Sequence, residues 1–244
     1  MEKLFAITSG KGGVGKSTVA VGIASALAEL GETVLLIDMD EGLRCLDLML
    51  GLSEKIAFDL SDALVNRDVR GALYPVDKHK GLYLIPAPDD KGKIDPDLFG
   101  EFIREAAKSF DRIILDFPAG FDFTNYTVLP DSTVFLTVCN PDPISLRDAF
   151  AVGDKLFTLK KQQLRLIINR FSYDYIKKGI YGGIDNMIDT TAIRLLGIVP
   201  LDYNLPISAC KGVVQKKGNA PKAFKRIAKR ITGQAVPLPK PKKI

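Results

Sequence analysis

A glycine-dense turn near the N-terminus constrains this chain more than any other stretch. An apolar run at residues 4–9, typical of a buried strand, leads into the sequence GKGGVGKS at residues 10–17. Small and apolar residues typical of a helix follow at 16–30. The spacing of glycine, lysine and serine in residues 10–17 fits the P-loop, in the strand–loop–helix context that this motif requires. We call residues 10–17 the phosphate loop.

The residue types in this loop suit a phosphate group. Backbone N–H groups of a glycine-rich turn can point inward at an anion, and the N-terminus of the following helix adds about half a positive charge. Lys16 is placed to reach the β- and γ-phosphates, and the Ser17 hydroxyl is placed to bind Mg²⁺. The predicted phosphate-binding residues are Gly10, Lys11, Gly12, Gly13, Val14, Gly15, Lys16, Ser17 and Thr18.

The same turn also matches the dinucleotide-binding fingerprint, which needs Gly10, Gly12 and Gly15 and an acid such as Asp38 at the end of the next strand. A dinucleotide site, however, has no use for a lysine and a hydroxyl directly after the last glycine. It also does not predict a second acid at another strand end. A turn without any ligand is favoured least, because unneeded glycines cost conformational entropy. The sequence therefore favours a mononucleotide P-loop.

Apolar runs alternate with helical patterns along the whole chain. We expect strands at residues 4–9, 33–38, 82–86, 112–116, 133–139, 164–169 and 197–200. We expect helices at residues 16–30, 58–66, 96–109, 144–160, 185–196 and 221–232. This alternation indicates an α/β fold with a single doubly wound, mostly parallel sheet of about seven or eight strands and helices on both faces. We assign residues 1–233 to one P-loop domain and residues 234–244 to a tail rich in proline and lysine.

Two of these strands end in aspartates that suit a magnesium site. Asp38 ends the second predicted strand, Asp40 follows it closely, and Asp116 ends the fourth. In a parallel sheet such strand ends meet at the edge where ligands bind. A carboxylate there can hold the waters of Mg²⁺ during phosphoryl transfer. The predicted metal ligands are Ser17, Asp38 and Asp116, and Gly120 would let the loop after it move as a switch.

Charge is unevenly distributed along the chain. The net charge is +5, yet no Asp or Glu follows Asp202, and residues 203–244 contain 11 of the 34 lysines and arginines. The preceding residues hold the other 23 bases against 29 acids. We call residues 203–244 the basic end. A basic end on an acidic body indicates contact with a polyanion, either a membrane surface or nucleic acid; a solvated helix and tail would give the same pattern.

The cysteines and the lack of long apolar runs bear on the compartment. Cys45, Cys139 and Cys210 lie far apart and form no CxxC pair, which predicts a reducing environment and argues against a zinc or iron–sulfur site. No apolar run approaches the ~18 residues of a spanning helix, and the sequence predicts no signal peptide. We therefore expect a cytoplasmic protein, with contact at the inner face of the cell membrane left open.

The stretch Lys11-Gly12-Gly13-Val14-Gly15-Lys16-Ser17 carries a second lysine before the glycines. This pattern is identified as the deviant Walker A motif of the MinD/ParA family of P-loop ATPases, and the resemblance extends over nearly the whole chain. Residues 38–48 resemble the family's switch I, residues 116–120 its Walker B motif and switch II, and residues 140–148 the stretch that follows. Within the family the resemblance is greatest to the MinD proteins, which place the division septum.

The resemblance implies a molecular switch that binds ATP or ADP with Mg²⁺ and hydrolyses ATP slowly unless a regulator, of the MinE kind or another protein, activates it. In the family ATP brings two subunits face to face, and the equivalent of Lys11 crosses to the partner's phosphates, where a cation neutralises developing charge. The implied catalytic residues are Lys11, Lys16 and Asp40, the last orienting the attacking water. The implied base-binding residues are Asn169, Arg170, Pro200 and Asp202.

Two departures from the family pattern matter. Cys45 stands where the MinD proteins usually have asparagine. The amphipathic membrane helix of these proteins also has no counterpart: we expect the apolar stripe of helix 221–232 to pack on the core, and the proline-rich tail cannot form such a helix. Weak electrostatic contact with an anionic membrane stays open, at ~1 kcal/mol per basic residue near the surface.

Three functions stay open from the sequence. The first is an ATP-driven, dimerising switch that places the division septum. The second is a partitioning ATPase of the ParA type, whose basic end binds DNA in a salt-sensitive way. The third is a nucleotide-gated interaction module with negligible turnover, such as a flagellar-number regulator.

Overall fold

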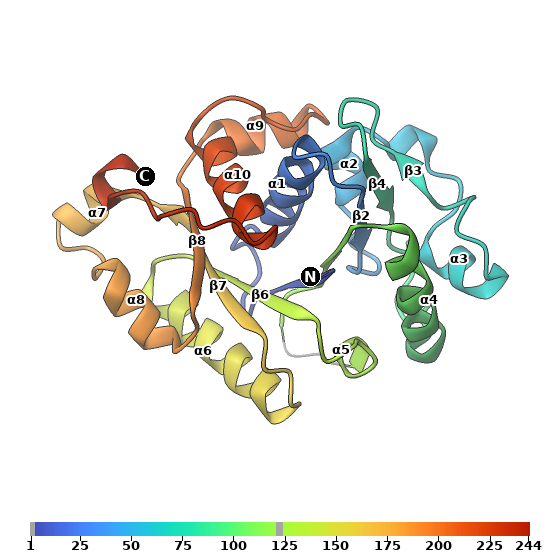
Figure 1. Ribbon diagram of the computed structural model, residues 1–244, viewed down its shortest axis with the longest axis horizontal. Helices are drawn as coiled ribbons and strands as arrows, with labels where there is room; N and C mark the ends of the chain where they lie inside the picture. Colours follow the sequence, from blue (N-terminus) through green and yellow to red (C-terminus); the bar gives the residue numbers. More distant parts are fainter. Residues whose placement is uncertain (1–2, 121–123) are drawn as a thin grey trace.

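The computed structural model describes residues 3–120 and 124–244, and in them eight strands form one sheet in the order β3-β4-β2-β5-β1-β6-β7-β8 (Figure 1). The strands are β1 (Leu4–Thr8), β2 (Val34–Asp38), β3 (Tyr74–Pro75), β4 (Leu82–Ile85), β5 (Arg112–Asp116), β6 (Val134–Cys139), β7 (Leu164–Phe171) and β8 (Leu195–Pro200). Every neighbouring pair is parallel except β3 with β4. The predicted fold class is confirmed.

Helices cover both faces of this sheet, with α1 and α10 on one side and α4, α5, α6 and α8 on the other (Figure 1). The helices are α1 (Lys16–Glu29), α2 (Leu46–Leu50), α3 (Leu60–Asn66), α4 (Pro96–Ser109), α5 (Thr124–Thr127), α6 (Pro143–Thr158), α7 (Tyr173–Lys177), α8 (Ile184–Thr191), α9 (Asn204–Cys210) and α10 (Asn219–Ile231). Two 3₁₀ turns, η1 (Ser53–Lys55) and η2 (Pro241–Lys243), complete the described elements.

The apolar strands are buried because each contributes side chains to both faces. In β1, Phe5 and Ile7 pack in the cluster with α1 and α10, whereas Leu4 and Ala6 pack in the cluster with α3 and α4. This alternation follows from the two-residue period of a strand. It explains why these strands are continuously apolar instead of alternating with polar residues.

Helix α10 closes one face through its apolar stripe, as the sequence predicts. Ala223, Phe224, Ile227, Ala228 and Ile231 are all buried against the core. The Phe224 ring lies so close to α1 that a Cβ on Gly22 would meet it at 2.4 Å. The absence of a side chain at position 22 therefore lets the two helices approach. The stripe is thus committed to the fold.

Several element boundaries differ from the sequence prediction. The two-residue edge strand β3 was not expected, so Asp116 ends β5 and not a fourth strand. The predicted helix 185–196 is wrong in its second half, because α8 ends at Thr191, Ala192 adopts a left-handed φ of 53°, and β8 begins at Leu195. Helices α2, α5, α7 and α9, which were not predicted from the sequence, have at most seven residues, or about two helical turns.

The tail, residues 234–244, crosses β8 in the view of Figure 1 and ends near α7. The Arg230 guanidinium donates to the carbonyl of Val236 at 2.8 Å and to that of Leu196. Ile244 packs at the edge of the cluster formed with α6 and α8. Among the residues that the structure describes, no helix has the length and apolar character needed to span a bilayer.

We expect Gly22→Ala to destabilise the protein by about 2 kcal/mol, because the new methyl group would push the Phe224 ring out of its packed position. The sign is diagnostic, since the same change inside an unconstrained helix stabilises by ~1 kcal/mol. Urea unfolding followed by circular dichroism measures the difference. Adding Phe224→Leu should reduce the penalty of Gly22→Ala. A Gly22→Ala variant more stable than the parent chain would contradict this packing argument.

Candidate nucleotide site

The phosphate loop has the conformation that its glycines predict. Gly13 and Gly15 adopt left-handed φ angles of 76° and 92°, which residues with a Cβ rarely adopt. Gly15 immediately precedes α1, so Lys16 and Ser17 lie at the N-terminus of a 14-residue helix. The helix dipole therefore adds positive potential where the loop would hold an anion.

The two lysines of the loop differ sharply in burial. The Lys16 side chain is buried, and its charge lowers the pKa of both Asp40 and Asp116 against their upward shifts. Lys11 is exposed at the tip of the loop. Lys16 is thus part of the site, whereas the Lys11 side chain is exposed to solvent.

Asp38 and Asp116 lie side by side at the ends of neighbouring strands. They are register partners in the parallel pair of β2 with β5, and both are almost fully buried. Burial, opposed by three backbone hydrogen bonds, raises the pKa of Asp38 from 3.8 to about 6. Burial and the neighbouring Asp38 raise the pKa of Asp116 to about 7. The fold therefore brings together two carboxylates whose shared negative charge is unfavourable.

These residues fit a divalent cation. Asp116 Oδ1 is buried without a hydrogen-bond partner among the described residues. The Ser17 side chain lowers the pKa of Asp116, which places the hydroxyl near this carboxylate. A hard cation such as Mg²⁺ prefers this oxygen set and would offset the repulsion between the carboxylates. Ser17 and Asp116, with Asp38 beside them, would hold it.

Asp38 also organises the start of residues 38–48, the segment that resembles switch I. Its Oδ1 accepts the N–H of Asp40 at 3.0 Å, and its Oδ2 accepts the N–H groups of Cys45 and Leu46 at 3.0 and 3.1 Å. The last two are the first N–H groups of α2, which a carboxylate satisfies well. Burial raises the pKa of the Cys45 thiol to about 12, which keeps it protonated. A carboxylate predicted only as a metal ligand thus also closes this loop.

Asp40 lies at the mouth of the site. It is half-buried, and burial raises its pKa, while Lys16 and Lys91 act in the opposite direction. Glu41 Oε1 accepts the N–H groups of Lys93 and Ile94 at 2.7 and 2.9 Å. These bonds hold Glu41, the residue next to Asp40, against the backbone of residues 93–94.

The four predicted base-binding residues are only partly brought together. Asn169, near the end of β7, is buried against the phosphate loop, whereas Arg170 is exposed with a left-handed φ of 53°. Pro200 ends β8 and is buried. Asp202 accepts the Asn204 N–H at 3.0 Å and the Gln215 side chain at 3.2 Å. Their contact with a base stays a prediction.

Some contacts to the site had no signal in the sequence. A Cβ on Gly10 would lie 2.7 Å from the carbonyl oxygen of Asp148, so α6 packs directly against the first glycine of the loop. The Tyr126 hydroxyl donates to Thr8 Oγ1 at 3.1 Å behind the loop. The predicted switch after Gly120 begins at residues 121–123, which lie outside the described residues.

This geometry defines the class of protein. A phosphate loop between β1 and α1, next to strand-end carboxylates at the ligand edge of a parallel sheet, is the arrangement of a P-loop nucleotide-binding protein. The family described as CobQ/CobB/MinD/ParA nucleotide binding domain matches residues 5–214. The chain belongs to this family.

Individual relatives agree over almost the whole chain. It is 36% identical to the septum site-determining protein MinD of Thermotoga maritima, over 98% of this chain and 91% of that protein. It superposes with a TM-score of 0.89 on a chain of the MinC:MinD cell division protein complex of Aquifex aeolicus, at 33% identity over 98% and 99% of the two chains. The TM-score is 0.80 with the Mg-ADP complex of Pyrococcus horikoshii MinD, at 27% identity over 95% and 96%.

We expect Asp116→Asn to stabilise the metal-free protein by about 2 kcal/mol at pH 8, because it removes a buried charge beside Asp38. The pKa of Asp116 is higher when folded, about 7 against 3.8, so the folded chain binds more protons in this window and loses stability as pH rises. The stability gained by Asp116→Asn should therefore be smaller at pH 5 than at pH 8. Thermal unfolding in EDTA at both pH values measures it.

Asp47→Asn is a matched control for this experiment. Asp47 is also buried, but it lies 3.4 Å from the Arg44 guanidinium and accepts the Leu48 N–H at 2.8 Å. Its replacement should destabilise the chain. Equal losses of stability in both variants would contradict the view that the Asp38–Asp116 pair is unfavourable without a cation.

Proposed function

We propose that this protein is an ATP-dependent dimerising switch that hydrolyses ATP and takes part in placing the division septum. The observation that carries the proposal is the pair of lysines on one formed phosphate loop, with Lys16 buried in the site and Lys11 exposed. A single subunit has no evident use for an exposed lysine at the tip of that loop. A second subunit that faces the loop has a use for this lysine. The septum role rests on the MinD relatives described above.

Different residues of the site would have different roles in ATP hydrolysis. Lys16 and the loop N–H groups bind the phosphates, and Ser17 with Asp116 holds the cation. Mg²⁺, when bound, supplies positive charge to the transferring phosphoryl group. Asp40 lies at the mouth of the site, where it would orient the attacking water. Lys11 of a second subunit would stabilise charge developing on the phosphoryl oxygens.

A protein regulator is expected for a switch of this kind. The Aquifex relative is described in a complex with MinC, which supports a protein partner for this chain as well. Helix α6 contacts the phosphate loop through Asp148 and exposes Phe150 and Phe157 by 47% and 66%. An apolar surface on a helix that touches the loop offers such a regulator a direct route to it.

We expect Lys16→Ala and Lys11→Ala to separate binding from turnover. Lys16→Ala should lower nucleotide affinity by about tenfold or more, because a buried charge-assisted contact is lost. Lys11→Ala should leave affinity nearly unchanged and lower ATP turnover by about a hundredfold or more, as for an arginine finger supplied in trans. Competition with a fluorescent nucleotide and phosphate release measure the two quantities.

Gel filtration with light scattering completes this experiment. Asp40→Ala should form dimers with ATP and Mg²⁺, because the water is no longer oriented and ATP persists. The same variant with ADP should remain a monomer. Wild-type turnover in Lys11→Ala would show that the lysine does not act in trans. Nucleotide binding without any turnover would favour the interaction module.

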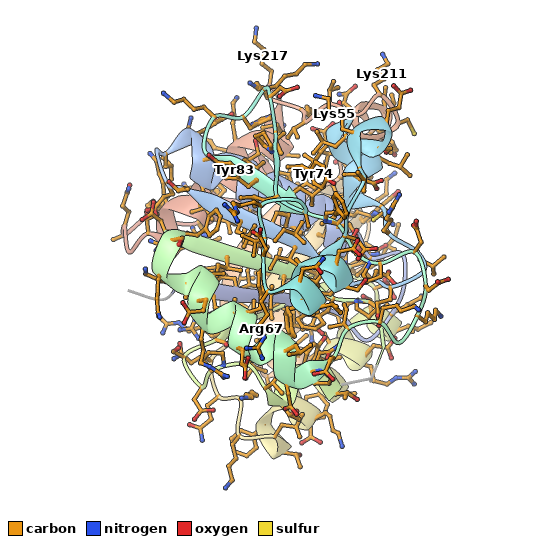
Figure 2. All side chains as sticks on the ribbon, turned by 90° about the vertical axis from the view of Figure 1, so that its right-hand side faces the viewer. Lys55, Arg67, Tyr74, Tyr83, Lys211 and Lys217 are labelled. Carbon is orange, nitrogen blue, oxygen red and sulfur yellow. The ribbon has the colours of Figure 1, made fainter. Side chains whose placement is uncertain are left out.

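A second candidate, the DNA-partitioning ATPase, is favoured by the basic end. Of its described lysines and arginines, only Lys225 lies within ion-pair distance of an acid, 3.6 Å from Glu29. Lys211 and Lys217 point outward at one end of the molecule (Figure 2). These unpaired cations suit a polyanion. If the protein places the septum, this polyanion would be the anionic lipid surface at the inner face of the cell membrane.

Sedimentation with anionic vesicles, beside a duplex-DNA shift assay, distinguishes these surfaces. We expect vesicle binding with ATP that weakens with salt, at ~1 kcal/mol per basic residue near the surface, and weaker binding with ADP. Lys211→Glu with Lys217→Glu should reduce it, and Lys155→Glu on α6 is the matched control. ATP-dependent, salt-sensitive DNA binding without vesicle binding would instead support partitioning. Neither response would leave a protein as the only surface recognised.

A further inference from the structure

Asn169 makes a contact with the phosphate loop that a base-binding role does not require. Its side-chain Nδ2 donates to the backbone carbonyl of Val14 at 2.8 Å, and the whole residue is buried. The partner is a carbonyl oxygen, so the donating atom must be the amide nitrogen and not the amide oxygen. The end of β7 is thus joined to a loop that lies 155 positions earlier in the chain.

The same amide group packs against the next residue of the loop. A Cβ placed on Gly15 would lie 2.4 Å from Asn169 Nδ2, a distance that no side chain tolerates. Gly15 is therefore needed for two reasons, its left-handed φ of 92° and the approach of Asn169. A side chain added at position 15 would move the loop or the Asn169 amide.

The hydrogen bond fixes the direction of a peptide group. In a trans peptide the C=O of one residue and the N–H of the next point in opposite directions. With the Val14 carbonyl held by Asn169, the Gly15 N–H is turned to the opposite side. This N–H donates to no other described residue. It remains available to an anion in the loop, which is how P-loops use their backbone N–H groups.

We propose that Asn169 is a positioning residue for phosphate binding, which presets the Val14–Gly15 peptide so that the Gly15 N–H faces the phosphates. The inference rests on the nucleotide site proposed above. It differs from a base contact in a measurable way, because its effect falls on the phosphates whatever base is attached. No other hydrogen bond of the Asn169 amide group is found among the described residues.

The decisive probe is a triphosphate without a base. We compare the affinities of ATP and of inorganic tripolyphosphate, each with Mg²⁺, by displacement of a fluorescent ADP analogue. Asn169→Ala should weaken both by a similar factor of roughly ten, because a buried carbonyl loses its donor and the peptide is freed. Asn169→Asp keeps the shape but sets an oxygen against the Val14 carbonyl, so it should weaken both at least as much.

Matched controls separate this effect from a general loss of structure. Asn186→Ala replaces an asparagine on α8, outside the site, and should change neither affinity. Circular dichroism of nucleotide-free Asn169→Ala should match that of the parent chain. Hydrogen exchange of the loop amides at residues 10–17 should be faster in Asn169→Ala than in the parent chain before any ligand is added.

Each alternative result has a distinct meaning. If Asn169→Ala weakens ATP but leaves tripolyphosphate unchanged, Asn169 acts on the base and the proposal is wrong. If the parent chain binds ATP but no tripolyphosphate, the loop is not preset by the chain, which also overturns it. If the parent chain binds neither ligand, the proposed nucleotide function itself fails. Equal losses for both ligands with an intact fold support the proposal.

Discussion

The proximity of two buried carboxylates is the constraint on which the rest of the site depends. Parallel pairing of β2 with β5 places Asp38 directly beside Asp116, and burial makes that pair unfavourable in the absence of a cation. The surrounding apolar strands stabilise the fold enough to hold the pair in place. Stability is thus given up at the edge of the sheet where chemistry is expected, as in other sites that hold unfavourable groups together.

The effect of Asp38 reaches beyond the cation. Its hydrogen bonds to the start of α2 place that helix, and the other end of α2 meets the loop after α9. There Gly51 and Gly212 cross so closely that a Cβ on Gly212 would lie 2.7 Å from the Gly51 Cα. Gln215, in the same loop, holds Asp202. A five-residue helix therefore joins the metal side of the site to the segment predicted to hold the base.

Local patterns in the sequence predicted the parts of the site that lie at fixed places relative to a strand or a helix. The loop glycines, Lys16, Ser17 and the strand-end aspartates could be identified because each follows a strand or opens a helix. The contacts that complete the site could not. Asn169 reaches Val14 only because the chain folds β7 next to β6, and Asp148 reaches Gly10 only through the position of α6. Edge strand β3 is too short to show a pattern in the sequence. Helix α8 ends where Ala192 adopts a left-handed φ, a conformation that cannot be predicted from an alanine.

Charge balance gives a physical reason for the dimer proposed above. Asp40 and Asp116 lie near one buried lysine, Lys16, and Asp38 lies beside Asp116, so carboxylates outnumber buried cations in the site before any ligand enters. A magnesium ion compensates for the carboxylates, but a triphosphate adds about four negative charges, which exceed what Lys16 and the loop N–H groups offset. In the proposed dimer a further cation would come from the facing subunit. Lys11 is exposed, and on a facing subunit it would enter the region of excess negative charge. Dimerisation would then follow from electrostatics that the nucleotide itself creates, and it would reverse when hydrolysis removes part of that charge.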